Sequence, residues 1–196
     1  MNASENMLEA PRLPGDRFIW YVIALECATF GVLFLSFAGA RAFHVEMFNT
    51  SQRELDVNMG AFNTALLLTA SWCVARAVAA VRAAAQKAGL LWLGTAIAGG
   101  LGFVIIKALE YADKAERGFG LSYNLFFDFY YVLTGFHLLH VVAGLFALAV
   151  AGVSLMQQPL QEDGARSAYA LETVGAFWHL VDMLWLVLFP LVYVVH

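Results

Sequence analysis

The sequence predicts an all-α integral membrane protein, a single bundle of five transmembrane helices. Two observations predict this class. Hydrophobic residues make up 61% of the 196 positions and charged residues only 13%, whereas soluble domains are about 45–50% apolar and about 25% charged. The apolar residues also gather in five long segments, and a helix needs about 20 of them to cross a hydrocarbon core roughly 30 Å thick.

The predicted spans cover residues 18–40, 62–81, 88–109, 126–155 and 174–196. They form one transmembrane domain, residues 18–196, after a polar N-terminal tail, residues 1–17. The tail lacks the short apolar core and small-residue cleavage site of a secretory signal. Pro14, Gly15 and Asp16 predict the start of the first helix, with Asp16 in position to cap it.

Two longer connections are predicted between the last three spans. Residues 112–123 contain a run of charged residues and glycines, which is typical of a loop. Residues 156–171 contain Pro159, Asp163 and Gly164, which favour a break in the helix.

The distribution of basic residues predicts how the bundle lies in the membrane. Arg76, Arg82 and Lys87 cluster around the short loop between the second and third spans, and such loops are cytoplasmic. The N-terminus is then cytoplasmic and the C-terminus periplasmic. The net charge of −4 and the lack of a basic cluster larger than this one give no indication of nucleic-acid binding.

Small residues recur at four-residue spacing in two spans and predict faces where helices pack closely. The third span carries Gly94, Ala98 and Gly102, and the fourth carries Ala143, Ala147 and Ala151. The two cysteines, Cys27 and Cys73, lack the spacing of a zinc site or a disulfide framework, so we interpret both as packing residues.

Ionisable residues lie inside the predicted spans, where they are costly and seldom accidental. They are Glu26, Asp128, His137, His140, His179 and Asp182. A rise of about 1.5 Å per residue puts Glu26, His137 and Asp182 each about 12–13 Å from the inner face. Groups from three helices are therefore predicted to meet in one layer. Asp128 lies near the outer end of its span and is expected at the interface.

A buried carboxylate costs several kcal/mol unless it is paired or protonated. We therefore expect Glu26 to pair with His137 or His140, and His179 to pair with Asp182, which lies three residues away on the same helix. Three roles stay open for this buried polar network. It could fix the register of the helices, handle protons or lipid headgroups, or ligate a metal or haem. The last is disfavoured because His137 and His140 would need further ligands at one point.

Aromatic residues are dense in the last two spans. Phe136, Trp178 and Trp185 are candidates to contact lipid acyl chains, with the interfacial belt or the protein core as alternatives.

Four motifs, in order along the chain, resemble a known family. They are NTALLL at residues 63–68, Glu110 followed by Tyr111, TGFHLLHVVAG at residues 134–144, and FWHLVDMLWL at residues 177–186 in the final span. Together they are similar to subunit III of the haem-copper oxidases. Glu26 in the first span falls where the family carries an intramembrane glutamate. The mitochondrial type of that subunit has seven spans, and this chain begins at what would be the third. It is therefore similar to the short five-span bacterial members, which include quinol-oxidase subunit III and the accessory protein associated with nitric oxide reductase.

The resemblance implies a non-catalytic subunit of the bacterial inner membrane that packs against catalytic subunit I of an oxidase or of nitric oxide reductase. It implies no redox centre in this chain, because the haem and copper of the family belong to subunit I. It also implies that the chain holds phospholipid, stabilises the catalytic core and supports proton uptake or oxygen access. Glu26, His137, His140 and Asp182 would form the polar core of such a subunit, with no catalytic residue and no metal ligand among them.

Two functions of other classes compete with this one. A free-standing proton-coupled transporter could use the same buried acids, but transporters usually show internal repeats and broken helices, and no repeat is visible here. A haem-binding electron carrier would be revealed by a Soret band in the absorption spectrum of the purified chain.

Overall fold

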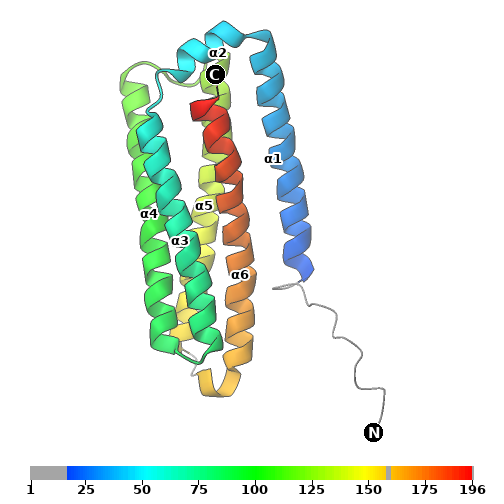
Figure 1. Ribbon diagram of the computed structural model, residues 1–196, viewed down its shortest axis with the longest axis vertical. Coiled ribbons are helices and arrows are strands. Elements are labelled where there is room, and N and C mark those ends of the chain that lie inside the picture. Colours follow the sequence, from blue (N-terminus) through cyan, green and yellow to red (C-terminus); the bar gives the residue numbers. More distant parts are fainter. Residues whose placement is uncertain (1–16, 158–159, 196) are drawn as a thin grey trace, which may run out of the picture.

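The computed structural model describes residues 17–157 and 160–195, and these residues form helices without a strand (Figure 1). The helices are α1 (Arg17–Phe43), α2 (Val45–Gln52), α3 (Val57–Arg82), α4 (Gln86–Glu116), α5 (Leu125–Gln157) and α6 (Leu160–Phe189), and α6 runs into the π-helical turn η1 (Pro190–Val194). Within the described residues, five helical segments are long and apolar enough to span a membrane: α1, α3, α4, α5 and residues 167–194. The predicted all-α class with five spans is therefore confirmed.

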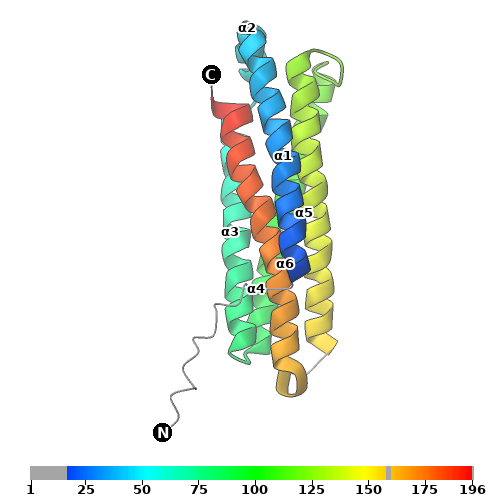
Figure 2. The ribbon, with the colours of Figure 1, turned by 90° about the vertical axis from the view of Figure 1, so that its right-hand side faces the viewer.

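The helices divide into a compact group of four and one peripheral helix. Helices α3 to α6 supply most of one buried apolar core, to which α1 adds Phe37 and α2 adds Phe48, and α1 lies at the edge of the bundle (Figures 1 and 2). In the most apolar 18-residue stretch of α1 only 6% of the residues are buried, whereas in that of the last span 50% are. The middle of α1 is held by a smaller cluster in which Phe30 contacts Leu180 and Leu184 of α6. The start of α1 and the C-terminal turn lie at opposite ends of the bundle, and the side of the membrane that each faces stays a prediction.

The helices are longer than the predicted spans. α4 continues to Glu116, so the loop that follows it is shorter than predicted. The prediction of a loop over residues 156–171 is wrong, because α5 ends at Gln157 and α6 begins at Leu160. Asp163 and Gly164 lie within the first turns of α6, where a glycine costs only about 1 kcal/mol and an acid is favourable. The helix-start signal at residues 14–16 lies outside the described residues.

The short helix α2 was not predicted from hydropathy. It crosses one end of the bundle between α1 and α3 (Figure 1). Asp56 then begins α3 as its N-cap: the carboxylate accepts hydrogen bonds from the backbone N–H groups of Asn58 at 2.9 Å and Met59 at 3.2 Å. An acceptor at this position satisfies two donors that the first turn of a helix leaves unpaired.

Close helix packing uses glycines other than the predicted ones. A Cβ atom on Gly94 would meet no atom within 4 Å, whereas one on Gly100 would lie 2.7 Å from the side chains of both Leu145 and Trp178. A Cβ atom on Gly144 of α5 would lie 2.9 Å from the same indole ring. Of the predicted residues, Gly102 approaches Leu66 of α3, where a Cβ atom would lie 3.4 Å away, whereas Ala143 is exposed. The closest contacts therefore lie outside the predicted series. Four-residue spacing identifies small residues but not the side of the helix that faces the core.

Candidate functional site

Lys107, on the inward face of α4, is a fully buried ionisable group. Its side chain is 0% exposed and its ammonium lies 3.1 Å from Oε2 of Glu110, one turn further along the same helix. The same nitrogen donates hydrogen bonds to the hydroxyls of Tyr193 at 2.9 Å and Tyr130 at 3.2 Å. These three partners satisfy its three N–H groups.

Glu110 completes a closed network with the same two tyrosines. Its Oε1 accepts a hydrogen bond from Tyr193 at 2.7 Å and another from Tyr130 at 2.8 Å. The rings of Tyr111 and Tyr130 also face the Lys107 ammonium at 4.8 Å, within the range of a cation–π interaction. A buried ion pair is tolerable only with such geometry and with its remaining polar atoms bonded. We call these four residues, Lys107, Glu110, Tyr130 and Tyr193, the Lys107 cluster.

The Lys107 cluster joins three parts of the chain that are distant in sequence. Lys107 and Glu110 come from α4, Tyr130 from α5 and Tyr193 from η1. Next to it, Tyr111 and Thr134 share a hydrogen bond of 2.7 Å between α4 and α5. The arrangement therefore fixes the C-terminal turn to the middle helices, and it presents a neutral ion pair rather than a free acid or base.

A second acid–base pair lies at the edge of the bundle, between α1 and α5. Nε2 of His140 lies 3.1 Å from Oε2 of Glu26, with the two side chains 12% and 19% exposed. Nδ1 of His140 lies 2.7 Å from the carbonyl oxygen of Phe136, which can only accept, so Nδ1 carries a hydrogen. The α5 backbone thus orients the imidazole so that Nε2 faces the Glu26 carboxyl group.

Of the two histidines predicted as partners of Glu26, the structure selects His140. His137 is fully buried instead, with its ring 5.0 Å from that of Trp185 and 5.7 Å from that of Phe103. Neither ring nitrogen of His137 has a hydrogen-bond partner among the residues that the structure describes. The residue thus contributes an aromatic surface to the core.

The predicted pairing of His179 with Asp182 is wrong. Nδ1 of His179 lies 2.6 Å from the hydroxyl of Ser71 on α3, because the imidazole turns toward the neighbouring helix and away from its own. Asp182 is 4% exposed, and in the described part of the chain neither carboxylate oxygen meets the geometry of a hydrogen bond. Ser71 lies near both groups, and its hydroxyl bonds His179.

The predicted single layer of ionisable groups is therefore divided. Glu26 and His140 form one pair, His179 bonds Ser71, and His137 lies in the aromatic core. Sequence reasoning missed the Lys107 cluster, although it left a signal. Residues 107, 110 and 114 fall on one face of α4, and a lysine and a glutamate three residues apart in an apolar span predict a buried pair.

Of the three candidates for lipid contact, only Phe136 lies at the surface. The indoles of Trp178 and Trp185 are 0% and 1% exposed, and Nε1 of Trp185 donates to the hydroxyl of Thr64 at 2.9 Å. Their burial argues against lipid contact. Phe136 lines a groove of about 440 Å³ between α1 and α5.

A second groove lies on the other side of α1, against α6, with a volume of about 490 Å³. Its lining includes Ile23, Leu180 and Leu184, together with Cys27. Cys27 is exposed and Cys73 is buried, so the prediction of a packing role is confirmed for Cys73 and wrong for Cys27. Both sides of α1 thus present apolar recesses at membrane depth.

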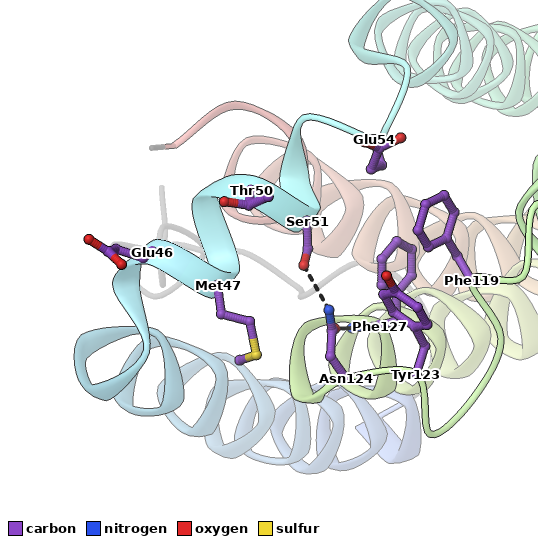
Figure 3. A pocket seen from close by; sticks show the side chains of 9 residues that line it. All are labelled: Glu46, Met47, Thr50, Ser51, Glu54, Phe119, Tyr123, Asn124 and Phe127. Carbon is purple, nitrogen blue, oxygen red and sulfur yellow. Dashed lines mark hydrogen bonds between the residues drawn. The ribbon is translucent and has the colours of Figure 1, made fainter.

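A third recess lies at the end of the bundle, where α2 meets the loop before α5 (Figure 3). Its volume is about 390 Å³. Asn124 closes its floor by donating to the hydroxyl of Ser51 at 2.9 Å, and the stacked rings of Phe119 and Phe127, 5.0 Å apart, form one wall. The carboxylate of Glu54 at its rim is already bonded to Arg117.

Among the described residues, no group of three or more His, Cys, Asp or Glu side chains has the arrangement of a metal site.

Comparison with known proteins identifies the family. A family model described as cytochrome c oxidase subunit III matches residues 27–196. The heme-copper oxidase subunit I+III of Aeropyrum pernix is 30% identical over 182 residues, which are 90% of this chain but 22% of that protein. The cytochrome c oxidase subunit 3 of a Synechocystis species is 36% identical over 141 residues, 71% of this chain and 58% of that protein.

The cytochrome bo(3) ubiquinol oxidase subunit 3 of Pseudomonas aeruginosa is 25% identical over 174 residues, 89% of this chain and 81% of that protein. The chain thus spans about a fifth of the Aeropyrum protein, somewhat over half of the Synechocystis protein and most of the Pseudomonas protein. These matches name oxidase subunits and do not support the alternative of a nitric oxide reductase subunit. Since the family model covers most of its length, the chain is a multi-pass membrane protein that belongs to the cytochrome c oxidase subunit III family.

Proposed function

We propose that the chain is a non-catalytic subunit of a respiratory haem-copper oxidase in a bacterial inner membrane, where it packs against the catalytic subunit and stabilises it. The observation that carries this proposal is how its buried charges are satisfied. Lys107 and Glu110 neutralise each other within one cluster, and Glu26 and His140 contact each other between two helices. Ionisable groups held in this way are suited to a scaffold.

The Aeropyrum relative supports the choice of partner. Its name describes subunits I and III in a single chain, and the part similar to this protein is 22% of its length. Joining two segments in one chain keeps them close to each other, as assembly into one complex also does. The haem and copper of the oxidase would lie in the catalytic subunit.

The two grooves beside α1 support the further proposal that the same subunit binds phospholipid. Each is lined mostly by apolar side chains, and α1 itself is the least buried of the spanning helices. Acyl chains in these grooves would fill the gaps between α1 and the four-helix core, because packing is the main force between helices in lipid. The Glu26–His140 pair lies beside this region and could support proton uptake by the complex.

Purification of the tagged full chain from native membranes tests the proposal. We expect a catalytic oxidase subunit to purify with it in about equal amount, together with the absorption spectrum of that subunit's haem. Haem bound in stoichiometric amount to the chain alone, or a purified chain with oxidase activity but no partner, would contradict the proposal.

A further inference from the structure

Arg76 lies on the outer surface of α3, away from every site described above. Its side chain is exposed, and among the residues whose side chains the structure describes, no carboxylate forms an ion pair with it. Its guanidinium carbon lies 5.7 Å from the centre of the Trp92 ring on α4. An unpaired arginine on the outside of a spanning helix needs an anion from its surroundings.

The depth of Arg76 matches the headgroup region of a bilayer. Arg76 precedes the last residue of α3, Arg82, by about 9 Å along the helix axis. The 26 residues of α3 extend over about 39 Å, roughly 9 Å more than the hydrocarbon core. If α3 is centred in the membrane, the Cα atom of Arg76 lies about 5 Å inside the boundary of the hydrocarbon core. Its long side chain can then extend outward to the lipid phosphates.

Two tryptophans mark the same level. Trp72 lies one turn from Arg76 on α3 and is 56% exposed, and its ring lies 5.1 Å from that of Trp92. Exposed indoles concentrate where the hydrocarbon meets the headgroups. The Trp92 ring covers one face of the guanidinium by a cation–π contact, which leaves the N–H edges free to donate to a phosphate in the paired geometry that arginine favours.

We propose that Arg76, with Trp72 and Trp92, binds the phosphate of an anionic phospholipid at the end of the bundle where α3 and α4 join. This site lies on a different face from the grooves beside α1. An anionic lipid is favoured over a zwitterionic one because its phosphate has no headgroup ammonium competing with the guanidinium. A carboxylate on a neighbouring subunit is the competing source of negative charge, and the experiment below separates the two.

The test uses the full chain reconstituted alone in phosphatidylcholine vesicles. A fraction of the lipid is replaced by either phosphatidylglycerol or phosphatidylcholine with bromine atoms near the top of the acyl chains, which quench tryptophan fluorescence on contact. A Trp20→Phe background removes the tryptophan on α1, so that Trp72 and Trp92 become the accessible reporters, since Trp178 and Trp185 are buried. We expect phosphatidylglycerol to be preferred about fivefold, the factor expected for one arginine near a headgroup.

Arg76→Gln should reduce this preference to about one. The matched control is Arg17→Gln, which removes an exposed arginine from the same end of the bundle but on α1, at the opposite edge from α4 (Figure 1); it should keep the preference. A second variant, Trp92→Phe, should weaken the preference while Trp72 still reports it. The melting temperature of each variant is measured to establish that it folds.

Equal quenching by the two lipids in the unsubstituted chain would overturn the proposal, as would an unchanged preference in Arg76→Gln. Equal losses in Arg76→Gln and Arg17→Gln would also overturn it, by indicating general charge attraction. If Arg76→Gln leaves lipid preference unchanged but releases a partner subunit from the purified complex, a carboxylate of that partner is the ligand and the proposal is wrong.

Discussion

Two acid–base pairs of the spanning helices, Lys107–Glu110 and Glu26–His140, differ in how closely the protein encloses them. Lys107 and Glu110 are 0% and 2% exposed and share two tyrosine hydroxyls from other parts of the chain. Glu26 and His140 are more exposed, and their pair lies between the loosely packed α1 and α5. The first pair is enclosed by protein, whereas the second adjoins surfaces that lipid or a partner can cover.

The comparison indicates that position, more than chemical type, decides the role of each pair. In the Lys107 cluster every charged atom is bonded to buried groups that can separate from it only if the chain unfolds. The cluster is therefore a structural element. At the edge, the pair has one contact between its carboxyl and imidazole groups and adjoins an apolar groove. That pair is therefore the one whose surroundings can change when the complex assembles.

The largest expected effect comes from breaking the Lys107 cluster. Lys107→Met leaves the Glu110 carboxylate buried without its counter-charge, and breaking a buried pair in this way costs about 3–5 kcal/mol. We expect a large loss of stability of the full chain in detergent, measured by denaturant unfolding. The same change in Lys87, an exposed residue at the turn between α3 and α4, should have little effect.

The double change Lys107→Met with Glu110→Gln sharpens this test. It removes both charges and leaves an amide for the hydroxyls of Tyr130 and Tyr193 to bond, so it should destabilise the chain less than Lys107→Met alone. A double variant that is less stable than the single one would show that the two residues do not compensate each other.

A smaller effect is expected when a glycine is replaced by alanine, and it should differ between the core and α1 at the edge. A Cβ atom on Gly100 would overlap Leu145 and Trp178, whereas one on Gly31 of α1 meets no atom within 4 Å. Overpacking costs about 1–3 kcal/mol, and alanine regains about 1 kcal/mol in helix propensity. Gly100→Ala should therefore lower the unfolding free energy by about 1 kcal/mol, and Gly31→Ala should leave it equal or higher. The reverse order would contradict the division into a compact core and a loose edge.

The smallest expected effect on the isolated chain comes from Glu26→Gln. The amide of the glutamine is uncharged and can still donate to Nε2 of His140, so the loss should be smaller than that of Lys107→Met. Melting curves of this variant beside those of Lys107→Met measure the difference between the two pairs directly. Equal losses would mean that the edge pair is as firmly built as the Lys107 cluster.

Hydropathy alone predicts the five spans, because membrane thickness sets the length of each apolar segment. It does not locate the helix ends, since α4 and α6 continue beyond the membrane with charged residues that are good helix formers. The amphipathic α2 is short and polar, so no apolar segment marks it. The spacing of small residues likewise identified packing residues without identifying the face that they occupy.

The sequence predicts that ionisable residues are paired inside the spans, but it does not predict which of them contact each other. The cost of a buried carboxylate predicts a partner for Glu26, and depth along the helices narrowed the choice to His137 or His140. Helix rotation then decides between two residues three positions apart, and hydropathy carries little information about rotation. The same uncertainty explains why His179 bonds Ser71 instead of Asp182.

The central claim is that the intramembrane acids of this chain support an oxidase complex without taking part in its chemistry. The most direct test is the initial rate of oxygen reduction per haem in the purified complex carrying Glu26→Ala, followed through prolonged turnover. We predict an initial rate within about twofold of the unsubstituted complex, with a shorter working lifetime or less retained lipid. An initial rate that falls to background in a fully assembled complex, with its haem content unchanged, would contradict the claim.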